Sequence, residues 1–144
     1  MKYTIIIDEN HEEEVIVYAR EKTKLTDEIE RLVSDNSLGL IGYDKNGEGV
    51  KLTADEVCCF TAEDSKVYAI TEKEKLRLKC RLYQLEEMLP DNFVKINQSC
   101  LANIRKISRF DTSVSGTLLI KFKNGYKDYV SRRQMKAVKE RFGL

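Results

Sequence analysis

Hydrophobic and polar positions alternate along much of the chain after residue 54, with the two-residue period of half-buried β-strands. This alternation predicts strands in the stretches "EVCCFTA", "KVYAIT", "LRLKC" and "FVKIN", with the turn "EDS" between the first two. Farther along, "GTLLIKFKNGYKDYVS" alternates on both sides of Asn124-Gly125, a dipeptide typical of hairpin turns. Strands are therefore the main predicted element of this part of the chain.

Three other stretches repeat their apolar residues at the spacing of an amphipathic helix. The apolar positions are Leu25, Ile29, Leu32 and Val33 in the first stretch, Leu82, Leu85 and Leu89 in the second, and Met135, Val138 and Phe142 in the third. Pro90 ends the second helix and Gly143 ends the third. Proline cannot continue a helix, and glycine readily adopts the left-handed conformation that closes one.

The first 53 residues predict a separate small module. The stretches "YTIII" and "EVIVYAR" are rich in β-branched residues and predict two strands ahead of the first helix. After that helix, "LGLIGYD" and "GVKLT" flank Asn46-Gly47, which predicts a hairpin. We therefore expect a β-β-α-β-β module over residues 1–53 and a strand-rich domain over residues 54–144. The expected fold class is α+β, mostly β.

The composition is typical of a folded domain with a hydrophobic core and a well-solvated surface. Hydrophobic residues make up 42% of the chain and charged residues 34%, and these proportions are not those of an intrinsically disordered protein. No apolar run approaches the roughly 18–20 residues that cross a bilayer. The start, "MKYTIIIDEN", has too short an apolar patch for a signal peptide. We therefore expect a cytoplasmic protein.

Charge is unevenly distributed along the chain, although the net charge is only +1. Residues 1–52 carry 7 basic and 12 acidic side chains, whereas residues 93–144 carry 12 basic and 3 acidic ones. An asymmetry of this size suggests that the carboxy-terminal third meets a polyanion such as a nucleic acid. The acidic amino-terminal part is not expected to bind DNA.

Side chains for catalysis or metal binding are sparse. The single histidine, His11, lies in an acidic stretch, and no glycine-rich phosphate loop or nucleophile beside a base is present. The cysteines Cys58, Cys59, Cys80 and Cys100 do not form a C-x-x-C pair, so we expect small, reduced core residues. Cys58 and Cys59 are expected on opposite faces of one strand. No enzymatic activity, metal or cofactor is expected.

The stretch "VSRRQ" combines a predicted helix start with two cations. Ser131 and Gln134 have the spacing of a capping box, so Ser131 is expected to begin the last helix. Arg132 and Arg133 then fall in the first turn, where the helix dipole is already positive. An anion bound there would meet free N–H groups, a hydroxyl and two guanidinium groups. The alternative is that both arginines pair with nearby acids.

A polar turn interrupts the apolar pattern of "FVKINQSCLANIRKI". Val94 and Ile96 are expected to face the core, which leaves the following polar residues outward. Gln98 has the amide that can bond the N6 and N7 atoms of adenine together. Ser99 and Asn103 suit either a phosphate contact or the capping of a turn.

This stretch resembles the LytTR DNA-binding domain, in which a strand of the form F-x-R-x-H-R-S leads into an apolar-Val-Asn turn and then an isoleucine. The resemblance extends upstream through "EVCCFTAEDSKVYAIT" and "LRLKCRLYQLEEMLP", and downstream through "SGTLLIKFKNGYKDYVSRR". It covers about residues 54–144. The sequence departs from the family pattern at Lys95, Asn97 and Ala102, where arginine, histidine and valine are usual.

The resemblance implies an elongated LytTR-like β fold with short helices, in a bacterial transcription regulator that inserts loop residues into major grooves of double-stranded DNA. The implied base-reading residues are Lys66, Gln98 and Arg132, and the implied DNA-backbone contacts are Ser99, Asn103, Ser131 and Arg133. Short regulators of this family lack a receiver domain and carry a small amino-terminal module instead. Paired direct repeats are their usual sites, so we expect a homodimer, with residues 1–53 in a dimerisation or regulatory role.

Two other functions are compatible with the sequence. The first is a protein-interaction module, such as an anti-regulator that binds a membrane partner. The second is an RNA-binding module, which usually stacks bases on aromatic side chains of a sheet. Tyr126 and Tyr129 have opposite parity on their strand, so they do not build one stacking platform.

Overall fold

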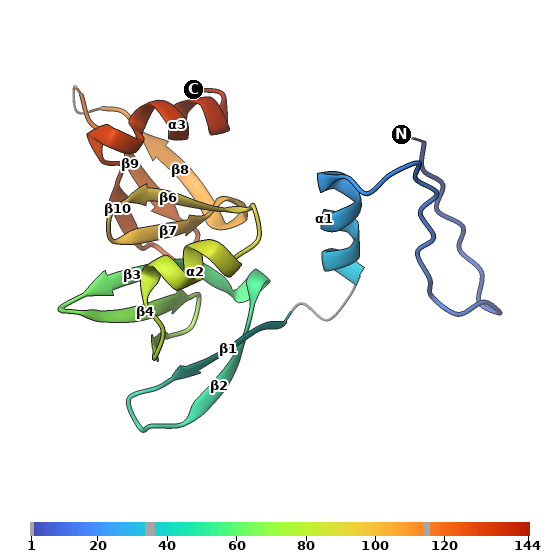
Figure 1. Ribbon diagram of the computed structural model, residues 1–144, viewed down its shortest axis with the longest axis horizontal. Helices are drawn as coiled ribbons and strands as arrows, with labels where there is room; N and C mark the ends of the chain where they lie inside the picture. The colour runs from blue at the N-terminus through green and yellow to red at the C-terminus, as the bar shows by residue number, and fades with distance from the viewer. Residues whose placement is uncertain (1, 34–36, 114–115) are drawn as a thin grey trace. The chain divides into compact units, whose positions relative to one another are not determined.

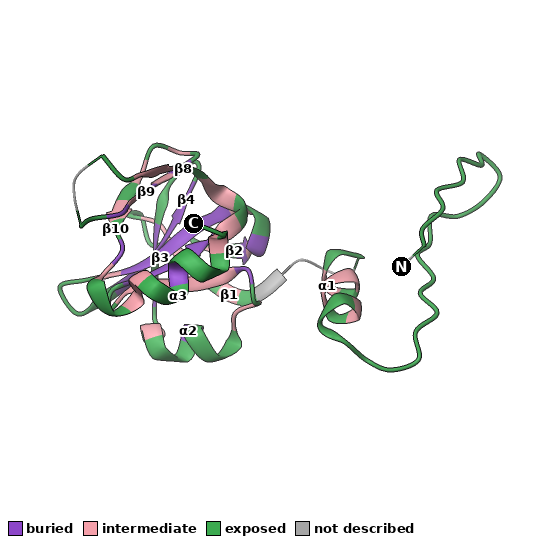
Figure 2. Ribbon diagram, turned by 90° about the horizontal axis from the view of Figure 1, so that it is seen from above, coloured by how far each residue is buried: buried purple, intermediate pink, exposed green. Residues whose placement is uncertain are grey.

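A computed structural model of the chain describes residues 2–33, 37–113 and 116–144. The chain divides into two compact units, Met1–Asn36 and Ser37–Leu144, which we describe separately. Figure 2 shows that buried residues gather in the second unit, whereas the described residues of the first unit are exposed or intermediate. None of the described helices has the length and apolar character needed to cross a membrane.

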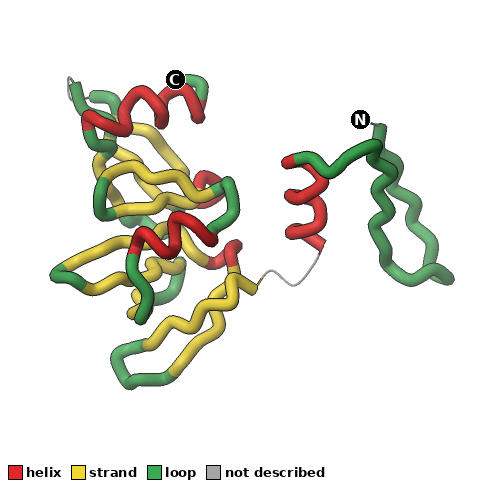
Figure 3. The backbone as a smooth tube through the Cα atoms, in the orientation of Figure 1, coloured by secondary structure: helices red, strands yellow, loops and turns green. Residues whose placement is uncertain are grey.

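Strands dominate the second unit, so the predicted α+β class with a majority of strands is confirmed (Figures 1 and 3). The strands are β1 (Ser37–Tyr43), β2 (Gly49–Thr53), β3 (Val57–Glu63), β4 (Lys66–Thr71), β5 (Lys75–Leu78), β6 (Phe93–Asn97), β7 (Cys100–Asn103), β8 (Ile107–Asp111), β9 (Leu119–Phe122) and β10 (Lys127–Tyr129). The helices are α1 (Lys24–Val33) in the first unit and α2 (Leu82–Met88) and α3 (Arg132–Phe142) in the second. Two short 3-10 turns, η1 (Ala54–Glu56) and η2 (Ile104–Lys106), precede β3 and β8.

Two antiparallel sheets form the second unit. The larger sheet has the strand order β2-β1-β5-β4-β3-β7-β6, and the smaller one has the order β10-β9-β8. Neighbours such as β3 and β4, β6 and β7, and β8 and β9 follow one another along the chain. Short connections of this kind suffice for antiparallel pairs, whereas parallel strands need a long crossover.

The larger sheet is covered on both faces, since neighbouring residues of one strand belong to different core clusters. On β4, Ala69 packs with the cluster that reaches Leu85 of α2, and Ile70 packs with the cluster that reaches Val138 of α3. Side chains of successive strand residues point to opposite faces of a sheet. The α2 helix therefore lies on one face, and the smaller sheet with α3 lies on the other.

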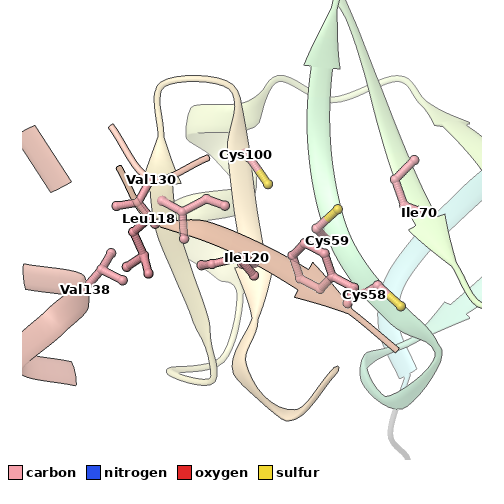
Figure 4. Packing of buried hydrophobic residues seen from close by; sticks show 11 residues of the cluster. Cys58, Cys59, Ile70, Cys100, Leu118, Ile120, Val130 and Val138 are labelled. Carbon is pink, nitrogen blue, oxygen red and sulfur yellow. The ribbon is translucent and has the colours of Figure 1, made fainter. Parts of the chain in front are cut away.

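The second of these clusters joins α3 to both sheets. Figure 4 shows Val138 of α3 beside Leu118 and Val130, with Ile120 farther in and Cys59 on the opposite side. All five side chains are at most 6% exposed. Burial of this kind contributes about 1.5–3 kcal/mol for each fully buried aliphatic side chain. The start of α3 is thus fixed to a packed core.

Most predicted elements of the second unit are confirmed. Strands β4 and β6 coincide with "KVYAIT" and "FVKIN", and α2 and α3 begin and end within their predicted stretches. Met135 and Phe142 pack beside the buried Val138, as the helical spacing predicted, and Gly143 closes α3 with a φ of 69°. The strands β7 and β8 were not predicted as separate elements.

The first unit differs from the prediction. Within residues 2–33 the structure describes one regular element, α1, and residues 3–7 and 14–20 do not form the expected strands. Their apolar side chains are exposed, from 38% for Val17 to 95% for Tyr18. An isolated pair of strands is at best marginally stable in water, because it has no third strand or helix to cover its apolar face.

The β1–β2 hairpin forms around Asn46-Gly47 as predicted, but it belongs to the larger sheet. Tyr43 of β1 pairs with Arg77 of β5, and Leu52 of β2 is fully buried in the core under α2. The structure therefore places the division of the chain at Ser37, where we had expected it after residue 53.

The two adjacent cysteines do not point to opposite faces, so that expectation was wrong. Cys58 and Cys59 are both fully buried in the cluster shared with α3. The pairing of β3 with β4 shifts register between Val57 and Cys59. A bulge of this kind inserts an extra residue and changes which side chains share a face.

Candidate nucleic-acid interface

The polar turn between β6 and β7 consists of Gln98 and Ser99, and both residues are exposed. Ile96 below it is fully buried and Val94 packs against the same core, so both face inward as predicted. The carbonyl of Ser99 accepts a hydrogen bond of 2.8 Å from the backbone N–H of Ala62 on β3. The turn is therefore anchored from below by its strand and from the side by β3.

The first residues of α3 lie directly beside this turn. Ser131 is the residue that begins the helix, as predicted, and its backbone N–H donates a 2.8 Å hydrogen bond to the carbonyl of Ile96. The predicted capping box does not form, since the Ser131 side chain makes no capping hydrogen bond. The backbone N–H of Gln134 instead donates to the Ser131 carbonyl at 3.1 Å. This geometry brings two polar segments, more than 30 residues apart in sequence, to one place.

Arg132 and Arg133 are exposed in the first turn of α3, which contains no acidic residue. Within residues 37–113 and 116–144, neither arginine forms an ion pair, so the alternative of pairing with nearby acids is not observed there. Two cations at the positive end of a helix are unfavourable by roughly 0.3–1 kcal/mol each. The same arrangement of guanidinium groups and helical N–H groups favours a bound anion.

Lys66 lies at the same end of the larger sheet as the polar turn. It begins β4 and pairs with Glu63, across a tight turn in which Asp64 and Ser65 have φ values of 49° and 66°. Thr61 of β3 pairs with the first residue of β7, so the end of β3 and the start of β7 are neighbours. Figure 1 shows both turns on the same side of the second unit. Lys66 is exposed, and no ion pair to it is found among the described residues.

We refer to these exposed or half-buried polar residues together as the turn surface. Its members are Lys66, Gln98, Ser99, Ser131, Arg132 and Arg133. Three backbone elements contribute to it: the β3–β4 turn, the β6–β7 turn and the start of α3. Six of the seven predicted site residues thus share one end of the fold.

Asn103 is the exception, because its side chain is 1% exposed and fully used inside the protein. Its Nδ2 donates to the carbonyl of Val57 at 2.8 Å and to that of Ala54 at 3.2 Å. Its Oδ1 accepts from the Asn92 side chain at 2.9 Å and from the Arg105 N–H at 3.1 Å. The bond from Arg105 caps η2, so the turn-capping alternative for Asn103 is confirmed, and the other bonds join η1 to η2.

Sequence reasoning missed the part played by Asn97 and Asp128, which lie between the two halves of the turn surface. The Asn97 side chain makes hydrogen bonds both within its own turn and across to β10, which ends just before α3. Its partner Asp128 is 31 residues away in sequence, and no local pattern links the two. Only the spacing of Asn97 and Ser99, typical of an Asx turn, carries a signal in the sequence.

Two ionisable groups beneath the turn surface, a thiol and a phenol, are neutral near pH 7. The pKa of the Cys100 thiol lies well above its usual value because it hydrogen-bonds Cys59 and is buried, and the nearby Asp128 carboxylate adds to the shift. Burial also raises the pKa of Tyr126 to about 12, although its hydrogen bond with Thr61 acts in the opposite direction. The positive charge at this end of the fold therefore comes from exposed side chains.

The turn surface can bind a phosphate and a base edge at once. Hydroxyls, helical N–H groups and guanidinium groups recognise phosphate, and amide or guanidinium groups form paired hydrogen bonds with base edges. The helices do not supply a helix–turn–helix, since five strands separate α1 from α2 and five more separate α2 from α3 among the described residues. The fold and the surface define a β-rich DNA-binding domain whose turns carry the polar side chains.

Comparison with known proteins agrees with this class. The family described as the LytTr DNA-binding domain matches residues 48–143. A Staphylococcus aureus (strain NCTC 8325) protein, described as an uncharacterized HTH-type transcriptional regulator, is 31% identical over 151 residues and is matched along 100% of this chain and 99% of its own. A second such protein, from strain MSSA476, is 32% identical over 127 residues, with 84% and 85% of the two chains covered.

A solved structure has the same fold. It is the LytTr DNA-binding domain of a Bacillus cereus protein described as a putative methyl-accepting/DNA response regulator, with a TM-score of 0.68 and 23% identity. The match covers 73% of this chain and 96% of that one. The chain belongs to the LytTR DNA-binding domain family.

Because Asn103 has a structural role, its substitution should lower the stability of the fold without a direct effect on the turn surface. Asn103→Ala leaves the buried carbonyl of Val57 and the Asn92 amide without their partner, and we expect the free energy of unfolding to fall by about 1–3 kcal/mol. Urea denaturation of the full chain measures this. The exposed Gln98→Ala is the matched control and should change stability by less than about 0.5 kcal/mol. Equal stability of both variants would contradict the assignment.

Proposed function

We propose that this protein is a bacterial transcription regulator that binds double-stranded DNA sequence-specifically, as a homodimer on direct repeats, in the cytoplasm. Membership of the LytTR family and the regulator descriptions of the Staphylococcus relatives support DNA as the partner and transcription as the process.

One observation carries the proposal most strongly. The 2.8 Å hydrogen bond from the Ser131 N–H to the Ile96 carbonyl places Gln98 beside two arginines that have no acidic partner in the described chain. Unneutralised cations at the positive end of a helix are unfavourable in the free protein and become favourable when a polyanion binds. Duplex DNA supplies both the phosphates and the base edges that this set of side chains can recognise.

Within this proposal the residues divide into two roles. Gln98 bonds adenine N6 and N7, Arg132 bonds guanine O6 and N7, and Lys66 approaches a neighbouring base. The backbone contacts come from Ser99, Ser131 and Arg133, which set the register of the protein on the duplex. The first group determines which sequence is bound, and the second determines how strongly any duplex is bound.

Selection of binding sites from random duplex DNA by the full-length chain tests the proposal. We expect the enriched sequences to contain two copies of one short motif in the same orientation. Enrichment of single-stranded RNA but of no duplex, in a parallel selection, would contradict the proposal and favour an RNA-binding module. Enrichment of neither nucleic acid would favour the protein-interaction alternative.

Once a DNA site has been selected, alanine substitutions of the two arginines should affect binding in different ways. Arg132→Ala should weaken binding to the selected site by roughly 1–3 kcal/mol, about 5–150-fold, and relax the preference at one base pair. Arg133→Ala should weaken binding to all duplexes alike and reduce the slope of log affinity against log salt concentration by about one. Fluorescence anisotropy on selected and scrambled duplexes at several salt concentrations measures both effects.

Lys73→Ala is the matched charge control for these variants. Lys73 is exposed and follows β4, so it lies at the opposite end of that strand from Lys66. Its removal should leave affinity for both duplexes within about twofold, because exposed charges beyond a Debye length of about 8–10 Å are largely screened. Equal losses on selected and scrambled duplexes for both arginine variants would contradict the two assigned roles.

Exposed apolar residues of the first unit support the homodimer. The exposed large apolar residues within residues 2–33 are Tyr3, Ile5, Ile6, Ile7, Val15, Ile16, Val17, Tyr18, Leu25, Leu32 and Val33. Such concentrations of exposed apolar surface mark interaction sites, and unpaired extended segments readily pair with another chain. In the proposal, a second copy covers these residues and holds two DNA-binding units together on one duplex.

Dimerisation through this unit predicts the effect of charged substitutions there. Ile6→Glu combined with Ile16→Glu should convert the dimer to a monomer, because a carboxylate would be buried without a partner. Light scattering coupled to gel filtration of the full chain measures the mass. Met88→Glu, at an exposed apolar position of α2, is the control and should leave the dimer intact. A monomeric wild-type chain would contradict dimerisation and support a regulatory partner, such as a membrane protein, at this unit.

A further inference from the structure

The side chain of Asn97 connects the two segments that meet at the turn surface. Its Oδ1 accepts a 2.8 Å hydrogen bond from the Ser99 N–H, which closes the turn around Gln98. Its Nδ2 donates to the Tyr129 carbonyl at 2.8 Å and to the Asp128 carboxylate at 3.1 Å. The amide thus uses its oxygen on one segment and both of its hydrogens on the other.

Asp128 is held in position for this contact by its own backbone. Its Oδ1 accepts a 2.8 Å hydrogen bond from the N–H of Tyr129, in addition to the bond from Asn97. The residues that follow, Val130 and Ser131, lead directly into α3, and Val130 is 6% exposed in the core. Any displacement of Asn97 is therefore transmitted to the helix start as well as to Gln98.

We propose that Asn97 is a positioning residue for base recognition: it fixes the Gln98 turn relative to the start of α3, and it acts through these segments rather than by touching DNA. This inference rests on the proposed function. Paired hydrogen bonds to base edges require donors and acceptors placed within about 0.5 Å. Phosphate contacts are mainly electrostatic and tolerate small displacements. Loss of the Asn97 contacts should therefore lower specificity more than it lowers general DNA affinity.

The Asn97–Asp128 pair allows a test by exchange of the two side chains. Asn97→Asp keeps an acceptor for the Ser99 N–H but places two carboxylates where an amide and a carboxylate are 3.1 Å apart. The double variant N97D/D128N restores one amide donor and one carboxylate acceptor, and it has the net charge of the wild-type chain. D128N alone keeps an acceptor for the Asn97 amide. It raises the net charge by one, whereas N97D lowers the net charge by one.

The measurement is the ratio of dissociation constants for a scrambled and a selected duplex of equal length, at one salt concentration. We expect N97D to lower this ratio by about tenfold or more, and N97D/D128N to restore it to within about threefold of wild type. D128N should keep the wild-type ratio while binding both duplexes more tightly. A merely structural role would change the fraction of folded protein and weaken both duplexes equally, which leaves the ratio unchanged. In the double variant the Tyr129 carbonyl still lacks its donor, so recovery of the ratio is due to the contact between residues 97 and 128.

Asn97→Ser provides a second variant without a change of charge. Its hydroxyl can still accept from the Ser99 N–H but is too short to bridge to β10, so the ratio should fall even if N97D does not fold. Thermal unfolding of every variant shows that it is folded. An unchanged ratio in N97S and N97D, or an equal weakening on both duplexes, would overturn the inference. A wild-type chain without preference for the selected duplex would overturn the proposed function itself.

Discussion

The hydrogen bond between the Ser131 N–H and the Ile96 carbonyl is the contact on which the proposed interface depends. It joins the end of β6 to the beginning of α3, and these two segments carry most of the turn surface. Backbone groups at a helix start have no partner within the helix, so this bond also satisfies a donor that would otherwise be exposed or unpaired. It is the direct backbone link between the segment that carries Gln98 and the segment that carries the two arginines.

The two segments joined by this contact also pack in one core. Ile96 and Val138 are fully buried in one cluster, so β6 and α3 are fixed to the same body of side chains on either side of the hydrogen bond. Above that core, the cations at the start of α3 lack acidic partners in the described chain. A protein that tolerates this electrostatic cost at the surface of a well-packed domain commonly does so at a functional site.

Local pattern was sufficient for the elements that make short-range contacts. The "FVKIN" strand and the hairpin around Asn124-Gly125 alternate, and "KVYAIT" is a short run rich in β-branched and aromatic residues that is buried on both faces. Strand β7 was missed because residues Cys100–Asn103 are all buried and show no alternation. The strands expected in residues 3–7 and 14–20 do not form, because strand formation depends on a partner that a propensity cannot supply.

The candidate site was predicted in its composition but not in its connections. Gln98, Ser99 and the arginines were recognisable from residue chemistry and family resemblance. The long-range contacts of Asn103 and Asn97 were not, because those partners lie 46–49 and 31–32 residues away in sequence. Asparagine side chains commonly contact phosphate, and only the fold shows that the amides of these two residues are bonded to the protein itself.

The most direct test of the central claim is a map of the backbone amide NMR shifts of the full-length protein on addition of its selected duplex. We expect the largest changes on residues 98–99 and 131–133 and smaller changes at Lys66. Changes concentrated on α2 or on the β1–β2 hairpin, with those turns unaffected, would contradict the claim.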